Sequence, residues 1–248
     1  MRTDRDSTLR LRRGVGLALS ALVLMTLAAV PVAQAQNAGA AAVARFKAQD
    51  FSDRAGAQAA AEQGLADYVQ RKQQQGGANA TAFDLARAGD LANTRIAGGF
   101  EVHTIAPQDI AAGRSELRHM VQASGIWRFF VKVGAKPVGL VTVQRMDGRW
   151  QAVSFGGAGL AQELSDLMAE HADVGADHLR FIRVHQAQTD LLEVVSPTDL
   201  QARYAPLASA RAALSTETQA TTSRLLDTYE LLEPLRNAVK RNLNGQTN

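Results

Sequence analysis

The stretch of residues 125–157 constrains the fold of this chain more than any other part of its sequence. From residue 127 to residue 133, large apolar side chains alternate with Arg128, Phe130 and Lys132, and a period of two is typical of a β-strand with one buried face. Asp147-Gly148 separates two later segments of the same kind, and an Asp-Gly pair in that position is the strongest short-range indication of a β-hairpin. The stretch therefore predicts a meander of three antiparallel strands.

The segments around the meander predict helices and further strands. After residue 157, Leu160, Leu164 and Leu167 recur with the spacing of a helix that lies on a sheet. The other predicted elements are a strand at residues 98–105, a pair of strands at residues 178–185 and 190–195, and a C-terminal helix at residues 223–243. This order predicts an α+β fold, in which an antiparallel sheet, the three-stranded meander plus further strands, is packed against helices.

Two serines mark the starts of further predicted helices. Ser115 precedes the segment of residues 116–122 in the position of a cap. Ser196 is followed directly by Pro197 and, three residues after the cap, by Asp199. Because a serine cap, a proline in the first helical position and an acid in the first turn all favour helix initiation, we expect helices after both serines.

The N-terminus has the pattern of a secretory leader. Five arginines among the first 13 residues precede an apolar run, which leads to the sequence Ala33-Gln34-Ala35. This is the order of a charged region, an apolar region and a cleavage site, so we expect cleavage after Ala35 and a periplasmic or secreted protein. The alternative is an inner-membrane protein anchored by an uncleaved leader, because about 20 apolar residues suffice to cross a bilayer.

The chain after the leader divides into two regions by composition. Residues 1–35 are the predicted leader, residues 36–80 an Ala- and Gln-rich helical segment with a linker, and residues 81–248 the globular domain. We expect the helical segment to be interrupted at Gly56 and Gly64, because glycine disfavours helix continuation.

Charge and cysteine content exclude several classes of protein. The leader holds five of the 27 basic and two of the 24 acidic residues, so the rest of the chain has 22 of each and no net charge. A nucleic-acid-binding protein usually carries a basic patch, and we expect no nucleic-acid partner. The chain has no cysteine, which excludes a lipid-modified cysteine and leaves a packed core as the source of stability. No membrane span is predicted after leader cleavage.

A catalytic serine and an anion site are the first candidate sites. The sequence around Ser154 is close to a nucleophile elbow, with Ala152 in place of its first glycine. The elbow belongs to a parallel sheet, however, whereas the predicted hairpin makes this strand antiparallel. Gly157, before the next helix, either contributes a backbone N–H to an anion site or lets the chain turn tightly.

The densest group of ligand-like side chains follows the helix of residues 158–170. It comprises His171, Asp173, Asp177 and His178. Imidazole and carboxylate groups suit several divalent metals, so these four residues are a candidate metal site. The alternative is a solvated polar loop, in which a histidine near the helix C-terminus is favoured by the helix dipole.

Three aromatic residues of the meander are candidates for a ligand or partner surface. Trp127 and Trp150 are either core residues or an aromatic platform. Phe130 shares its predicted face with Arg128 and Lys132, so it lies either under a second helix or in an exposed patch.

These observations favour an exported, non-enzymatic binding or adaptor protein with a protein or small-ligand partner in the cell envelope. Two alternatives remain open. One is a small-molecule-binding domain with a pocket between sheet and helices, around Phe129, Phe155 and Leu164. The other is a hydrolase that uses Ser154 or the His171–His178 loop. No cofactor is predicted.

Overall fold

The computed structural model describes residues 32–75, 82–112, 115–214 and 224–245. The chain forms two compact units, residues 1–46 and residues 47–248. Most of the predicted leader and most of the predicted linker lie outside the described residues. The first unit is described only through the beginning of helix α1 (Val32–Gln74), and the sheet and all other helices belong to the second.

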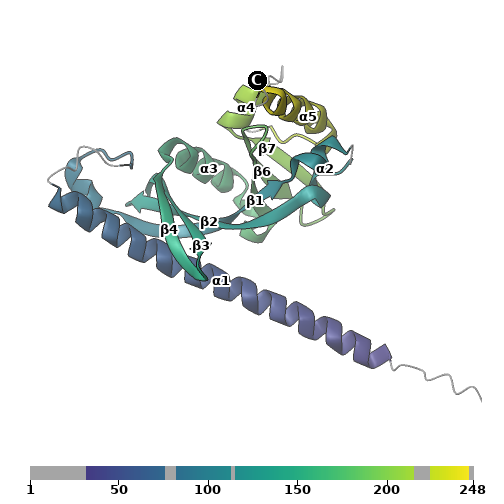
Figure 1. The fold of residues 1–248 in the computed structure, drawn as a ribbon, viewed down its shortest axis with the longest axis horizontal. Helices are drawn as coiled ribbons and strands as arrows, with labels where there is room; N and C mark the ends of the chain where they lie inside the picture. The colour runs from purple at the N-terminus through teal and green to yellow at the C-terminus, as the bar shows by residue number, and fades with distance from the viewer. Residues whose placement is uncertain (1–31, 76–81, 113–114, 215–223, 246–248) are drawn as a thin grey trace, which may run out of the picture. The chain divides into compact units, whose positions relative to one another are not determined.

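A mixed seven-stranded sheet runs through the second unit (Figure 1), in the strand order β4-β3-β2-β1-β5-β6-β7. The strands are β1 (Arg95–Ile105), β2 (Val121–Val133), β3 (Lys136–Met146), β4 (Arg149–Gly156), β5 (Leu179–Val184), β6 (Thr189–Val195) and β7 (Ala202–Pro206). Helices accompany the sheet, so the α+β class is confirmed, and β2, β3 and β4 form the predicted meander.

The sheet differs from the prediction in one pair of strands, because β1 and β5 are parallel whereas all other neighbours are antiparallel. The chain leaves β4 at one edge, and helix α3 (Ala158–Glu170) carries it back over the sheet to the free side of β1. Such a crossover joins strands that are distant in the sequence, and a helix is its usual form. The sequence pattern does not predict that β1 and β5 pair in parallel.

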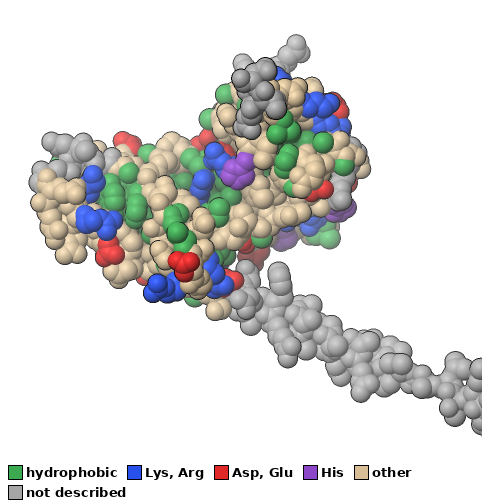
Figure 2. Space-filling view, viewed as in Figure 1, with side chains coloured by type: hydrophobic (Ala, Val, Ile, Leu, Met, Phe, Trp, Pro, Cys, Tyr) green, Lys and Arg blue, Asp and Glu red, His purple; other side chains and the backbone are tan. Residues whose placement is uncertain are grey.

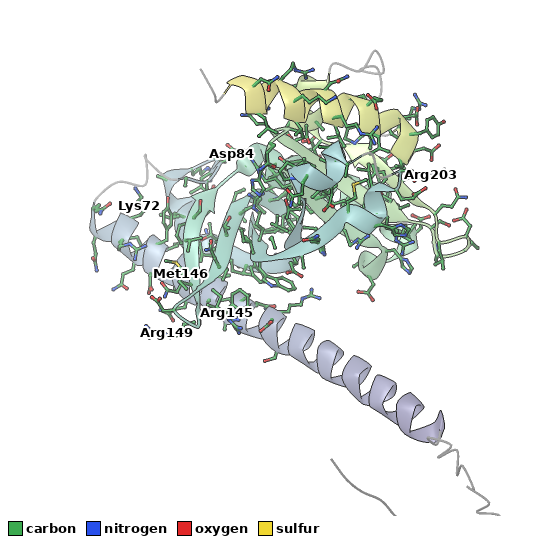
Figure 3. All side chains as sticks on the ribbon, turned by 45° about the vertical axis from the view of Figure 1, so that its right-hand side comes forward. Lys72, Asp84, Arg145, Met146, Arg149 and Arg203 are labelled. Atoms are coloured by element: carbon green, nitrogen blue, oxygen red, sulfur yellow. The ribbon has the colours of Figure 1, made fainter. Side chains whose placement is uncertain are left out.

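The β3–β4 hairpin has the predicted turn. Asp147 and Gly148 both have positive φ angles, 51° and 77°, as a type I′ turn requires of its two central residues. Arg145, Met146 and Arg149 lie at this end of the hairpin (Figure 3), and the Arg145 guanidinium lies 4.9 Å from the centre of the Trp150 ring.

The two helices predicted from serine caps are not formed as expected. The segment after Ser115 holds a short 3-10 helix, η3 (Leu117–Met120), and β2 begins directly after it. Ser196 closes a turn instead, because its Oγ accepts hydrogen bonds from the N–H groups of Thr198 and Asp199 at 3.3 and 3.4 Å. The same hydroxyl-to-backbone bonds that cap a helix also stabilise isolated turns, and β7 follows this one.

The described helices cover both faces of the sheet. The remaining ones are η2 (Ala88–Asn93), α2 (Pro107–Ala111), η4 (Ala172–Val174), η5 (Ala176–His178), α4 (Ala208–Leu214) and α5 (Thr228–Gly245). One face carries α1 over β2, β3 and β4, and α2, η3, α4 and α5 over β5, β6 and β7. The opposite face carries α3, whose Leu164 and Leu167 pack against apolar residues of β1, β2, β3, β5 and β6.

Helix α1 continues through Gly56 and Gly64, where an interruption was predicted. Both glycines face β4. A Cβ atom on Gly56 would lie 2.7 Å from the Trp150 ring, and one on Gly64 would lie 2.3 Å from the Cβ of Ala152. The glycines therefore permit a close approach of helix and strand, and the apolar contacts made there outweigh the roughly 1 kcal/mol by which each glycine disfavours a helix.

Candidate functional site

A cleft of about 660 Å³ lies between α3 and the beginning of α4. Figure 1 labels both helices, and Figure 2 shows the same view of the surface. Leu160 and Leu167 of α3 face Leu207 and Ala208 across the cleft. Polar and charged side chains, among them Gln162 and Glu163, line the rest of the cleft, so it suits a small molecule with both apolar and polar groups.

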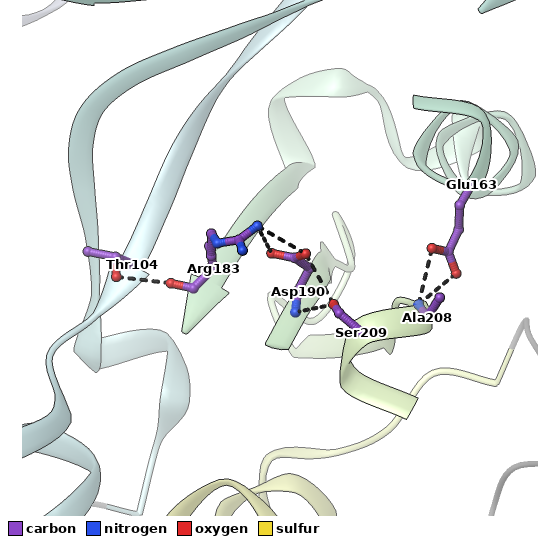
Figure 4. A network of polar contacts seen from close by, with 6 residues as sticks. All are labelled: Thr104, Glu163, Arg183, Asp190, Ala208 and Ser209. Atoms are coloured by element: carbon purple, nitrogen blue, oxygen red, sulfur yellow. Dashed lines mark hydrogen bonds and ion pairs between the residues drawn. The ribbon is translucent and has the colours of Figure 1, made fainter. Parts of the chain in front are cut away.

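The sheet end of the cleft is closed by Asp190, which is 6 % exposed. Its carboxylate accepts bonds from Nη1 of Arg183 at 3.2 and 3.3 Å and from Oγ of Ser209 at 3.1 Å (Figure 4). The Asp190 backbone N–H donates to the same Oγ at 2.9 Å. Thr104 fixes the strand that carries Arg183, since its Oγ1 donates to the Arg183 carbonyl at 2.9 Å. This carboxylate is therefore buried, paired and held in place.

A second carboxylate, on Glu163 of α3, joins the two walls of the cleft. It accepts hydrogen bonds from the Ala208 backbone N–H at 2.9 and 3.1 Å (Figure 4) and from Nη2 of Arg211 at 2.7 Å. The first N–H groups of a helix have no partner within the helix, so Glu163 satisfies one of them in α4. Nη1 of Arg211 donates in turn to the Pro206 carbonyl at 2.6 Å.

Two further acids of α3, Asp166 and Glu170, line the cleft and are exposed. Asp166 accepts a hydrogen bond from Nε2 of Gln162 at 2.9 Å. Neither carboxylate forms an ion pair with any residue that the structure describes. The mouth of the cleft is therefore negative, with apolar walls behind it, and this combination favours a ligand with a positive charge on an apolar body.

Of the three predicted aromatic surface residues, Trp127 and Phe130 are buried in the core and Trp150 is half-buried. Trp127 is 7 % exposed and lies with Trp150 on the sheet face that α1 covers. Phe130, also 7 % exposed, lies on the opposite face under α3. The structure therefore provides no platform on which the three rings meet. Gly157 is the N-cap of α3 with a φ of 71°, a left-handed conformation that favours glycine.

The four predicted metal ligands follow α3. His171 is its C-cap, Asp173 and Asp177 lie in η4 and η5, and His178 ends η5. Within the part of the chain that the structure describes, no group of three or more His, Asp or Glu side chains is arranged to hold a metal ion. We therefore assign these residues no part in the function proposed below.

The other two predicted sites are also not assembled. Ser154 is exposed on β4, and no hydrogen bond joins it to a histidine among the described residues, so we assign it no catalytic role. Phe129 and Phe155 pack on the α1 face, whereas Leu164 packs on the α3 face. These three side chains cannot line one pocket.

Sequence reasoning missed the cleft because its walls come from separate segments. One indication was present, since Glu163, Asp166 and Glu170 recur at i, i+3 and i+7 and so share one side of the predicted helix. The facing wall follows β7 and belongs to α4, a helix of seven residues, and nothing in the sequence places it beside α3.

Comparison with known proteins gives no relative. No family model, curated protein or solved structure matches the chain. Over the described residues, no helix is both long and apolar enough to cross a membrane.

Proposed function

We propose that this chain is an exported, non-enzymatic binding protein that holds a small organic cation in the cleft between α3 and α4. The observation that carries the proposal is the cleft itself, whose volume of about 660 Å³ lies within the range of about 300–1,000 Å³ typical of small-molecule sites. Export is supported by the leader pattern at residues 1–35.

The charges of the cleft support a cationic ligand. Glu163 and Asp190 are already neutralised by Arg211 and Arg183, and they fix the shape of the site. Asp166 and Glu170 keep their charge at the mouth, where they attract a cation and leave the apolar walls to bind its body. The site holds its two internal carboxylates in fixed ion pairs, which suits positioning of a ligand better than proton transfer.

Gly159 permits a direct test, because it lines the cleft and a Cβ atom at this position would contact nothing within 4 Å. Gly159→Leu should occupy part of the cleft with a side chain whose Cβ meets no other atom, and its better helix propensity should keep or raise stability by up to about 1 kcal/mol. Gly89→Leu is the matched control, because a Cβ on Gly89 also meets nothing within 4 Å and the residue lies outside the cleft.

The measurement is native mass spectrometry of the protein isolated from the envelope fraction of its host, followed by calorimetric titration with benzyltrimethylammonium. We expect wild type and Gly89→Leu to retain a small mass that denaturation releases, and to bind the probe. Gly159→Leu should lose both properties. Equal binding by all three proteins, or no binding by wild type, would reject the cleft as the site.

A second candidate function, an adaptor for a protein partner, is favoured by a separate surface. Leu200 and Tyr229 are 60 % and 75 % exposed and lie along one groove of about 520 Å³ with Arg118 and His119. Exposed apolar side chains with a polar rim are typical of interaction surfaces. Crosslinking through a photoreactive residue at position 229 in the cell envelope would detect such a partner.

A further inference from the structure

The sheet has two edge strands, and only one of them is covered by the part of the chain that the structure describes. At β7, Tyr204 exchanges two backbone hydrogen bonds, of 2.9 and 2.8 Å, with Leu226. At the other end of the sheet (Figure 1), β4 pairs with β3 on one side, and no hydrogen bond joins the other side of its backbone to a described residue. The outward N–H and C=O groups of β4 therefore form a row that is able to pair with another strand.

Solvent reaches β4 along its whole length. None of its eight residues is buried, and Val153 is 42 % exposed, whereas every residue of β6, inside the sheet, is buried. Residues 150–155 include neither a charged residue nor a proline, so two of the usual protections of an edge strand are missing there. The edge is therefore accessible to an incoming strand.

A β-bulge limits what can pair with this edge. Two consecutive residues of β3 pair with Ala152 and Ser154, so Val153 between them has no partner. A bulge bends the strand and increases its twist, which discourages a long, flat pairing with the same edge of a second copy. The regular stretch before the bulge, residues 149–152, suits a short flexible peptide, because such a peptide can follow the local twist. The bulge therefore favours a peptide over a second copy of this chain.

A groove beside the edge defines one side chain of the peptide. The groove has a volume of about 290 Å³ and lies between α1 and β4. Its walls include Gly64 of α1 and the half-buried side chains of Trp150, Ala152 and Phe155. An added strand directs alternate side chains to the same face as those of its neighbour. An apolar side chain of the peptide therefore fits this groove.

Cations lie towards both ends of the edge. Arg149 begins β4 and is exposed, whereas Arg71 of α1 lines the groove near Phe155, towards the end of the strand. Neither guanidinium forms an ion pair with a residue that the structure describes. Asp67, which also lines the groove, accepts a hydrogen bond from Nε2 of Gln63 at 2.8 Å. The two unpaired arginines complement acidic residues on either side of the apolar one.

We infer that the edge of β4 binds an extended peptide segment of a partner protein, with an apolar residue at its centre and an acidic residue towards each end. The peptide adds a strand beside residues 149–152. Its backbone hydrogen bonds supply affinity, and its central side chain, in the groove between α1 and β4, supplies specificity. No residue of β4 lines the cleft between α3 and α4, so the inference goes beyond the function proposed above.

The test uses the capped peptide Glu-Thr-Val-Leu-Val-Thr-Glu in calorimetric titrations of the purified protein. A second peptide of the same sequence is N-methylated at its three central residues, which removes backbone donors from both of its edges. A third peptide has lysine in place of both glutamates. Arg71→Glu and Arg149→Glu reverse the two charges on the protein. Lys240→Glu is the matched control, because Lys240 is exposed on α5 and lines neither the groove nor the cleft.

We expect saturable binding of the acidic peptide by wild type and Lys240→Glu. Affinity should be about three- to tenfold lower in Arg71→Glu and in Arg149→Glu, because each reversal replaces an attraction by a repulsion at an exposed site. Wild type should bind the lysine peptide more weakly and the N-methylated peptide not at all. Hydrogen exchange in residues 149–156 should slow when the acidic peptide binds.

Absence of saturable binding by wild type, or equal binding of the N-methylated peptide, would overturn the inference. Equal binding of the acidic and the lysine peptide would overturn its charge specificity. If exchange in β4 slows with rising protein concentration and without peptide, a second copy occupies the edge and the peptide assignment is wrong. The peptide comparisons use wild type, so the test remains valid if a variant does not fold. Gly159→Leu should bind the peptide as wild type does, which keeps failure of this site distinct from failure of the cleft.

Discussion

Substitution of Gly64 by alanine should destabilise the protein, although the same substitution normally stabilises a helix. Alanine is favoured over glycine by about 1 kcal/mol in a helix interior. At Gly64, however, the new Cβ would lie 2.3 Å from the Cβ of Ala152, where ordinary contact begins at about 3.4 Å. Helix α1 would have to move away from β4 by roughly 1 Å, and overpacking of this kind costs typically 1–3 kcal/mol.

The net effect depends on how rigid the contact is. Ala152 is a strand residue whose Cβ has no rotational freedom, so we take the upper end of the range. Gly64→Ala should then lower the free energy of unfolding by about 2 kcal/mol, or the melting temperature by roughly 4–8 °C for a chain of this size. Gly159→Ala is the control in α3: a Cβ there contacts nothing, and we expect a gain of up to about 1 kcal/mol.

Urea denaturation followed by circular dichroism measures both variants, and a second substitution tests the cause. Ala152→Gly removes the colliding methyl group, so in the Gly64→Ala background it should recover most of the lost stability. The double-mutant cycle should give a favourable coupling energy of about 2 kcal/mol. If Gly64→Ala is as stable as Gly159→Ala, or if Ala152→Gly lowers stability equally in both backgrounds, α1 does not contact β4 as closely as described.

Three further predictions concern the polar groups. Ser209→Ala removes both hydrogen bonds to Asp190 and should cost about 1–3 kcal/mol in urea denaturation; a loss below about 0.5 kcal/mol would contradict the network. Glu163→Gln should cost a similar amount, because its charge-assisted bonds to α4 are weakened, and hydrogen exchange of the Ala208 amide should rise; unchanged exchange would argue against the bond. Burial, and then Arg180, lower the pKa of His103 from about 6.5, so the unfolded chain binds the proton more tightly and stability falls as the pH drops below about 6.5. His103→Gln should flatten this decline between pH 7.5 and 5.5, and an unchanged slope would contradict it.

The parts of the fold that the sequence predicts are those that depend on neighbouring residues. Asp147-Gly148 specifies its turn through two positive φ angles, and the leucines of α3 mark the side that packs on the sheet. The parallel pairing of β1 with β5 depends on residues about 80 positions apart, such as Val102 and Phe181. Local patterns carry no information on such a pair, so the prediction assigned an antiparallel sheet throughout.

Local sequence patterns also fail to predict the environment of single side chains in the candidate sites. The alternation of side chains along β2 correctly places Phe130 on the same face of the sheet as Arg128. It does not reveal that α3 covers this face. With α3 in place, Phe130 becomes a core residue and Arg128 becomes a half-buried cation in place of a solvated one. The sequence therefore presents Arg128 as ordinary surface charge, whereas the structure places its guanidinium over the Phe181 ring, with Nε and Nη1 buried.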